Sequence, residues 1–219
     1  MYKRTISESR LNSFKLAETD TQDVLCRRYI DNIRLSESLY PSLSLLEVAL
    51  RNAIDLAIET LIKQNWLFEE VKAQNLLKQN DYSKLLEANN TIIKNYGEAN
   101  RTKGKLISEL NFGFWIFLCS TKYNPILWTK KNFFMTVFPN YPKNKKQSIA
   151  DISSKLQKIR KLRNRIFHHE PIYKQYKTLI DRYNEIIEIL SYLPQDSLKI
   201  IEQTCRFKDI YKQILEKEK

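Results

Sequence analysis

Apolar residues recur at spacings of three and four along most of the chain, which is the pattern of amphipathic α-helices. The clearest series consists of Leu43, Leu46, Leu50, Ile54, Ala57 and Leu61. Pro41 precedes this series, and Ser42 or Ser44 is suited to cap the helix, because serine side chains accept hydrogen bonds from first-turn amides. A separate helix with the same periodicity is predicted over residues 21–39.

The middle of the chain contains further helices and many aromatic residues. Asp81 is expected to cap a helix that ends at Gly97, and residues 103–119 are expected to form the most buried helix. Aromatic residues at helical spacing are more often core than ligand-binding, so we expect a core role rather than base stacking. The residues concerned are Phe112, Phe114, Trp115, Phe133, Phe134 and Phe138.

The segment 139–146 is rich in proline and lysine and has no periodicity, so it is predicted to be a loop. A long helix is expected over 147–169, and another after Pro171. Pro194 ends that helix, and Asp196 caps a polar C-terminal helix. The loop could divide two domains, but the helices on either side are too few to stand alone. We therefore expect one all-α domain, 1–193, followed by the C-terminal helix 194–219.

Composition excludes several classes of protein. Only 3 glycines are present, too few for the turns of an all-β fold, and no GxGxxG or GxxxxGK[ST] motif occurs. The 3 cysteines and 2 histidines form no zinc-ligand pattern, so neither a metal nor a cofactor is expected. No apolar run reaches the length of a membrane span, which predicts a cytoplasmic protein. The net charge of +12 favours a polyanionic partner such as nucleic acid.

The residues best suited to catalysis lie at the end of the helix expected over 147–169. His168 and His169 are adjacent, and histidine is the side chain best suited to exchange protons near neutral pH. Arg163 carries a permanent charge and grips phosphate in a bidentate manner. Helical geometry places Arg163 on the same face as the apolar positions of this helix, and His168 roughly 140° away. Either the helix loosens before Pro171, or a second copy completes the site in a symmetric homodimer.

A simpler interpretation stays open for each of these residues. Arg163 could pair with Glu170 or Glu47, and the two histidines could form a solvated helix end. Arg51 lies four residues after Glu47, which is the spacing of an ordinary ion pair on a helix surface. If these side chains are not simply surface ion pairs, they are candidates to support the site from around the motif. The candidates are Glu47, Arg51, Asn52 and Glu170.

The motif Arg163-Asn164-x-x-x-His168-His169-Glu170-Pro171 resembles the signature of the Abi-like (AbiD/AbiF-type) abortive-infection family, which belongs to the HEPN superfamily. Residues 46–54 resemble the N-terminal helix of that family. Residues 104–115, with Leu127 and Trp128 after them, resemble its central block. The resemblance covers residues 20–190 and does not extend beyond Pro194.

This resemblance implies an all-α HEPN-type helical bundle with additional helices, and a metal-independent endoribonuclease that acts as a toxin in antiphage defence. Arg163 corresponds to the motif arginine, Asn164 to the polar residue after it, and His168 to the motif histidine. His169 also satisfies the motif spacing, so the acting base is left open between the two histidines. The family further implies a homodimer with a composite site and an antitoxin, either a small protein or a non-coding RNA.

Basic residues lead into the motif and predict a path for RNA. Residues 143–165 contain nine basic side chains and one acidic one, Asp151. The candidates for RNA contact are Lys155, Lys158, Arg160, Lys161 and Arg165. The same run is compatible with a merely solvated helix face. A catalytically silent RNA-binding module in a defence or toxin–antitoxin complex is the competing functional hypothesis, and a membrane-surface protein has no support at either terminus.

Overall fold

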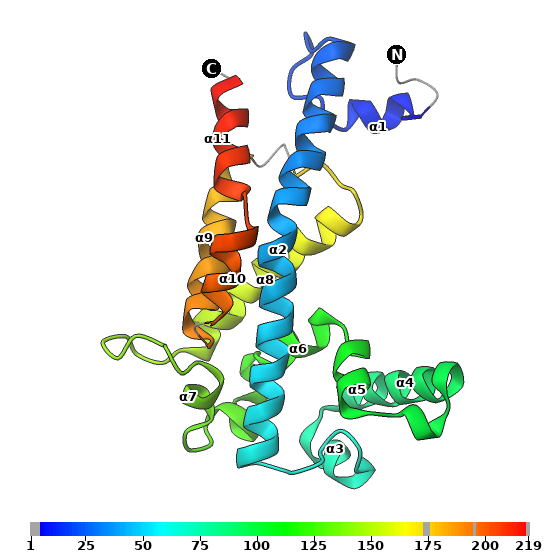
Figure 1. Cartoon of the computed structure of the whole chain (residues 1–219), viewed down its shortest axis with the longest axis vertical. Helices are drawn as coiled ribbons and strands as arrows, with labels where there is room; N and C mark the ends of the chain where they lie inside the picture. The colour runs from blue at the N-terminus through cyan, green and yellow to red at the C-terminus, as the bar shows by residue number, and fades with distance from the viewer. Residues whose placement is uncertain (1–4, 173–175, 195, 218–219) are drawn as a thin grey trace. The chain divides into compact units, whose positions relative to one another are not determined.

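The computed structural model describes residues 5–172, 176–194 and 196–217. Over these residues the regular structure is helical and contains no strand, so the all-α prediction is confirmed (Figure 1). The α-helices are α1 (Glu8–Asn12), α2 (Gln22–Leu61), α3 (Glu70–Leu76), α4 (Gln79–Tyr96), α5 (Lys103–Glu109), α6 (Phe112–Leu118), α7 (Phe133–Val137), α8 (Ile149–Phe167), α9 (Tyr176–Tyr192), α10 (Asp196–Thr204) and α11 (Phe207–Lys217). Short helical turns at Glu98–Asn100, Thr121–Tyr123 and Asn124–Trp128 are labelled η1 to η3.

The chain forms two compact units whose segments alternate along the sequence. The first unit comprises Met1–Leu45, Lys158–Glu188 and Leu198–Lys219, and the second comprises Leu46–Gln157 and Ile189–Ser197. The loop 139–146 lies inside the second unit and does not divide the two. The Asn140 amide donates to Tyr192 O at 3.1 Å, and its side chain donates to Leu193 O at 2.6 Å. The expected domain ranges, 1–193 and 194–219, stay a prediction.

Residues 22–61 form one helix, α2, instead of the two that Pro41 predicted. Pro41 lies inside α2 and has no N–H to donate to the carbonyl four residues earlier. Ser42 is not a cap, since its hydroxyl donates to Leu39 O at 2.9 Å within the helix. Leu35, Leu39, Leu43 and Leu46 are all buried. Packing of this apolar face on both sides of the proline compensates for the missing hydrogen bond, and so the helix continues.

Two further element predictions were wrong. α4 begins at Gln79, so Asp81 lies in its first turn and is fully buried, where it accepts a hydrogen bond from Tyr123 Oη at 2.9 Å. Gly97 does end α4, with φ of 81°. The helix expected over 103–119 is split into α5 and α6, because the Asn111 side chain caps α6 by accepting from the Phe114 amide.

The C-terminal segment, expected as one polar helix, consists of α10 and α11. α11 is amphipathic, with Phe207 and Ile214 buried. The Phe207 ring stacks on Tyr183 of α9, with 4.7 Å between ring centroids. Apolar contact with α9 therefore makes this segment part of the core of the first unit.

Aromatic side chains form much of the core of the second unit, as predicted. Each of the six residues named as core candidates is at most 6% exposed: Phe112, Phe114, Trp115, Phe133, Phe134 and Phe138. The indole N–H groups also have partners. Trp115 donates to Leu110 O at 3.2 Å, and Trp128 donates to Leu118 O at 2.7 Å. Burial of the rings is thus compatible with hydrogen bonding of their polar atoms.

Candidate functional site at the end of helix α8

The last turns of α8 present an arginine beside an aromatic ring. Leu156, Ile159 and Leu162 are buried, as the apolar face of this helix predicted. Arg163 is half-buried on that face. Its guanidinium carbon lies 4.3 Å from the centre of the Phe167 ring, one turn further along the helix. This cation–π contact directs the cation toward the C-terminal end of the helix.

The helix then ends in a tight turn at the two histidines. The Glu170 amide donates to Arg165 O at 2.8 Å, and the His169 amide donates to Ile166 O at 3.0 Å. These two hydrogen bonds define a Schellman motif, whose penultimate residue adopts the left-handed conformation. His169 occupies that position with φ of 56°, where glycine is usual. The helix therefore does end before Pro171, which was one of the two alternatives derived from helical geometry.

A buried asparagine of α2 holds the chain just after the histidines. Asn32 Oδ1 accepts a hydrogen bond from the Ile172 amide at 2.8 Å, and Asn32 Nδ2 donates to Glu170 O at 3.5 Å. Both Asn32 and Ile172 are buried. Since these bonds fix the backbone on the C-terminal side of His169, Asn32 helps to set the position of that histidine.

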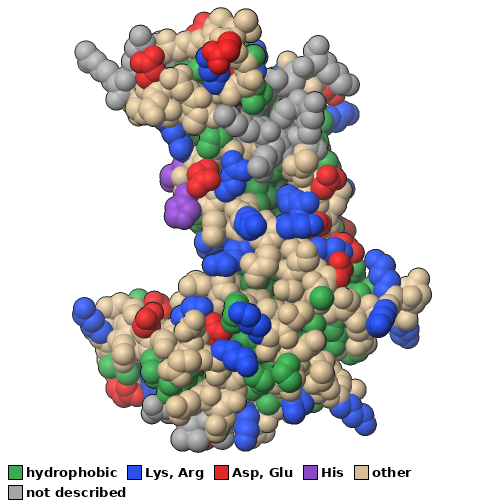
Figure 2. All heavy atoms as spheres, turned by 180° about the vertical axis from the view of Figure 1, so that it is seen from behind, with side chains coloured by type: hydrophobic (Ala, Val, Ile, Leu, Met, Phe, Trp, Pro, Cys, Tyr) green, Lys and Arg blue, Asp and Glu red, His purple; other side chains and the backbone are tan. Residues whose placement is uncertain are grey.

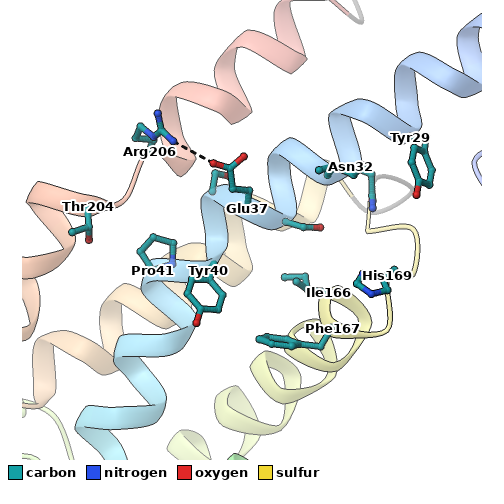
Figure 3. Close-up of a pocket in the computed structure, with 13 residues that line it drawn as sticks. Tyr29, Asn32, Glu37, Tyr40, Pro41, Ile166, Phe167, His169, Thr204 and Arg206 are labelled. Atoms are coloured by element: carbon teal, nitrogen blue, oxygen red, sulfur yellow. Dashed lines mark hydrogen bonds and ion pairs between the residues drawn. The ribbon is translucent and has the colours of Figure 1, made fainter.

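A groove of about 700 Å³ lies between the first half of α2, the end of α8 and the end of α10 (Figure 3). All of its lining residues belong to the first unit. They are Tyr29, Asn32, Ile33, Ser36, Glu37, Ser38, Tyr40, Pro41, Ile166, Phe167, His169, Thr204 and Arg206. Phe167 carries the Arg163 guanidinium on its ring, so the cation lies beside the groove.

Aromatic and charged side chains occur together in this groove. Tyr40 is 54% exposed and Phe167 is 45% exposed, and their ring centroids are 6.3 Å apart. Arg206 Nη2 lies 3.3 Å from Glu37 Oε1, and both side chains are largely exposed. The sequence pattern did not identify Tyr40, Glu37 or Arg206, because they come from segments far from the motif. The gathering of these side chains in one groove is visible in the tertiary structure alone.

The two histidines occupy different positions relative to this groove. Both are exposed, and Figure 2 shows them adjacent on the surface among Lys, Arg, Asp and Glu side chains. His169 lines the groove, whereas His168 lies outside its lining. The His168 amide donates to Asn164 O at 2.9 Å, and Asn164 itself is half-buried on α8. Arg163, Asn164 and the histidines are thus gathered within the last turns of α8 and the cap that follows.

Glu170 pairs with Arg165 across the turn that ends α8. Arg165 Nε lies 3.3 Å from Glu170 Oε2, and Arg165 Nη2 donates to Pro171 O at 2.5 Å. These contacts span the same turn as the Schellman motif. Arg165, which was expected to contact RNA, therefore has a structural role in closing the helix end.

The other candidate RNA-contact residues differ in their surroundings. Lys155 Nζ lies 3.3 Å from Asp151 Oδ2, and Lys158 Nζ lies 3.7 Å from Glu185 Oε1. Arg160 and Lys161 are exposed on α8. These two side chains are consequently the best placed of the set to contact a polyanion.

The other three candidates for supporting residues lie on the second half of α2, in the second unit. Glu47 and Arg51 are half-buried, and Asn52 is exposed. Their relation to the motif stays a prediction.

The described residues offer no group of three or more His, Cys, Asp or Glu side chains placed to hold a metal ion. Burial raises the pKa of the Cys119 thiol well above its ordinary value, which makes this cysteine a poor nucleophile. Burial also raises the pKa of Tyr183, and the neighbouring Cys205 adds to the shift. Neither Cys119 nor Tyr183 is therefore suited to transfer protons near neutral pH.

No helix among the described residues has both the length and the apolar character needed to cross a membrane. Comparison of the chain with models of protein families found no match. Comparisons with curated proteins and with solved structures also found none. The resemblance to the Abi-like family therefore stays a prediction from the sequence.

Proposed function

We propose that this protein is a metal-independent endoribonuclease of the HEPN type, acting as a toxin in antiphage defence. The observation that carries the proposal is the arrangement at the end of α8. Arg163 lies against Phe167, and His169 is turned into the groove that Phe167 lines. Arg163 would bind the phosphate and a histidine would transfer protons, which are the two functions that phosphodiester cleavage by an internal nucleophile requires.

In this reaction the ribose 2′-oxygen attacks the adjacent phosphorus, and the bond from phosphorus to the 5′-oxygen breaks. The products are a 2′,3′-cyclic phosphate and a 5′-hydroxyl, and no external oxidant or metal is needed. One histidine removes the proton of the 2′-hydroxyl as the general base. A protonated histidine gives a proton to the departing 5′-oxygen. Arg163 stabilises the negative charge that develops on the phosphate oxygens.

Each of the two histidines is favoured as the general base by a different observation. His168 is the residue that the family motif indicates, and His169 lines the groove. Asn164 lies one turn before His168 and would orient a histidine or the phosphate through hydrogen bonds. A second copy of the chain would add its own Arg163 and histidines to the site, as the family resemblance implies. An antitoxin, either RNA or protein, would restrain the activity in the cell.

The test is cleavage of labelled single-stranded and tRNA-like RNAs in the presence of EDTA. Wild-type protein is expected to cut the RNA and leave 2′,3′-cyclic phosphate ends. The Arg163→Ala/His168→Ala double variant should lose at least about 100-fold in rate, since general acid–base catalysis contributes about 10²–10⁴-fold. A requirement for added metal would overturn the mechanism. RNA that shifts on a native gel without being cut would favour the silent binding module.

Arg101→Ala is the matched control for loss of the arginine. Arg101 is also half-buried, and its guanidinium carbon lies 5.5 Å from the centre of the Phe68 ring in the second unit. This variant removes a comparable cation–π contact away from the motif, so its cleavage rate should equal that of wild type. An equal loss in both variants would mean that reduced folding, not site chemistry, lowers the rate.

A further inference from the structure

We propose that the groove beside His169 is a nucleobase subsite that selects guanine. The base stacks on the Tyr40 ring, and Glu37 and Arg206 form hydrogen bonds with the edge of the base. The inference rests on the proposed function, because it names the base that flanks the cleaved phosphate. Its evidence is separate, since it comes from groove residues outside the Arg163–His169 motif.

The first argument is the exposure of aromatic surface inside a concave site. Tyr40 is 54% exposed although it lines the groove, and Phe167 is 45% exposed beside it. The Phe167 ring already carries the Arg163 guanidinium, so Tyr40 offers the more open ring. Single-stranded RNA is bound by stacking of its splayed bases on such side chains.

The second argument is the placement of charge around these rings. A nucleotide combines a flat, weakly polar base with an anionic phosphate. The groove matches this combination, since Phe167 carries the Arg163 guanidinium on its ring, and Arg206 lines the groove together with Tyr40 (Figure 3). A purely apolar ligand would gain nothing from these cations.

The third argument concerns the edge of the base. Glu37 stands one helical turn before Tyr40 on α2 and contacts Arg206 through Oε1 at 3.3 Å. A carboxylate presents acceptors on both oxygens. Guanine is the base whose Watson–Crick edge offers two adjacent N–H donors, at N1 and N2, with the O6 acceptor next to them. Glu37 would accept from the two donors, and Arg206 would donate to O6.

The ion pair between Glu37 and Arg206 does not prevent these two side chains from binding a base instead of each other. The side chains of Arg206 and Glu37 are 75% and 68% exposed, respectively. An ion pair with this exposure is weakly held, so its two partners can turn toward a ligand at little cost.

The experiment is calorimetric titration of the full chain with the 3′-monophosphates of guanosine, adenosine, cytidine and uridine. We expect guanosine monophosphate to bind about tenfold tighter than the other three, within the range of a bidentate contact. Tyr40→Ala should weaken guanosine binding by about 5- to 150-fold, as loss of one base stack does. Tyr40→Phe should retain binding, because the ring remains. Glu37→Gln should remove the preference for guanine over adenine.

Two exposed residues in the second unit serve as matched controls. Tyr96 is 57% exposed, and the Glu98 side chain is 63% exposed and paired with Arg101. Tyr96→Ala and Glu98→Gln should leave all four affinities unchanged.

The possible failures are distinguishable. Absence of binding by every nucleotide would overturn the subsite, whatever the cleavage assay shows. Equal affinity for the four bases, or guanine binding that survives Tyr40→Ala, would overturn the assigned selectivity or location. Guanine-selective binding by a protein that never cuts RNA would sustain the subsite and overturn the proposed ribonuclease.

Discussion

The guanidinium carbon of Arg163 lies 4.3 Å from the centre of the Phe167 ring, so the motif arginine is held by a residue inside the motif itself. Phe167 also lines the groove and lies 6.3 Å from Tyr40, between ring centroids. One side chain thus links the candidate phosphate-binding cation to the candidate base-binding surface.

Replacement of Phe167 by leucine should therefore slow RNA cleavage without abolishing it. A cation–π contact at an exposed site is worth about 0.5–1 kcal/mol, which corresponds to roughly a two- to fivefold loss in rate. Single-turnover cleavage by Phe167→Leu is the measurement. A loss as large as that of Arg163→Ala would show that the ring does more than orient the arginine.

The left-handed conformation of His169 allows its backbone and its imidazole to be tested separately. Residues other than glycine pay about 1–2 kcal/mol for this conformation, so His169→Gly should be more stable than His169→Ala by about that amount. Urea unfolding of the two variants checks the difference. Both variants lack the imidazole. Equal cleavage rates in the two variants would therefore show that any loss of activity relative to wild type comes from the missing imidazole and not from the backbone conformation. Identical stabilities would contradict the role given to the cap.

Asn32→Ala should destabilise the protein by about 1–3 kcal/mol, because it leaves the buried Ile172 amide without its acceptor. Hydrogen exchange at the Ile172 amide should accelerate in the variant, and cleavage should fall as the segment after His169 loosens. Unchanged exchange at this amide would mean that the hydrogen bond does not fix the segment. Ser83→Ala removes a solvent-exposed hydrogen bond from the Ser83 hydroxyl to Gln79 O within α4 and is the control.

Arg160 and Lys161 are expected to contribute electrostatic attraction for RNA without base selectivity. The Arg160→Ala/Lys161→Ala variant should lower the slope of log affinity against log salt concentration by about 1.4, or about 0.7 for each lost phosphate contact. Lys130→Ala/Lys131→Ala, another exposed basic pair, should leave the slope unchanged. An unaltered slope in the first variant would place the RNA path elsewhere.

Asp20 should make folding stability depend on pH in the acid range. Its carboxylate accepts from Arg28 Nη1 at 2.5 Å and from the amides of Ala17 and Leu16, both at 2.7 Å. The hydrogen bond from Arg28, followed by those from the two amides, holds the pKa of Asp20 well below its usual range. Because the folded-state pKa is the lower one, this stabilisation is present above the unfolded pKa and is lost as pH falls through the folded pKa.

The measurement is thermal unfolding of wild type and Asp20→Asn from about pH 7 down to about pH 3. The variant should have a lower melting temperature than wild type near neutral pH. The difference between the two melting temperatures should decrease as the pH falls. Glu18→Gln, which removes an exposed carboxylate, should show no such trend. A gap that stays constant with pH would contradict the assigned role of the charge.

The spacing of apolar residues was enough to predict the all-α class, the buried aromatic core and the helix that carries Arg163. Periodicity reports which face of a helix is buried, and this information is local. The proline rule was misleading at Pro41, and the periodicity was misleading at residues 103–119. Packing of α2 overrode the proline, and an unrecognised Asn111 cap divided the second segment.

The sequence alone also determined which side chains bear the candidate chemistry, since the chain has only two histidines and both follow Arg163 closely. It could not place His168 and His169 relative to the groove. Their placement depends on the left-handed turn at His169 and on Asn32, whose contact with Ile172 spans 140 residues of sequence. The groove was likewise decided by tertiary structure, because Tyr40, Phe167 and Arg206 meet only when α2, α8 and the segment after α10 pack together. Contacts between distant segments depend on how faces fit, which no local pattern encodes.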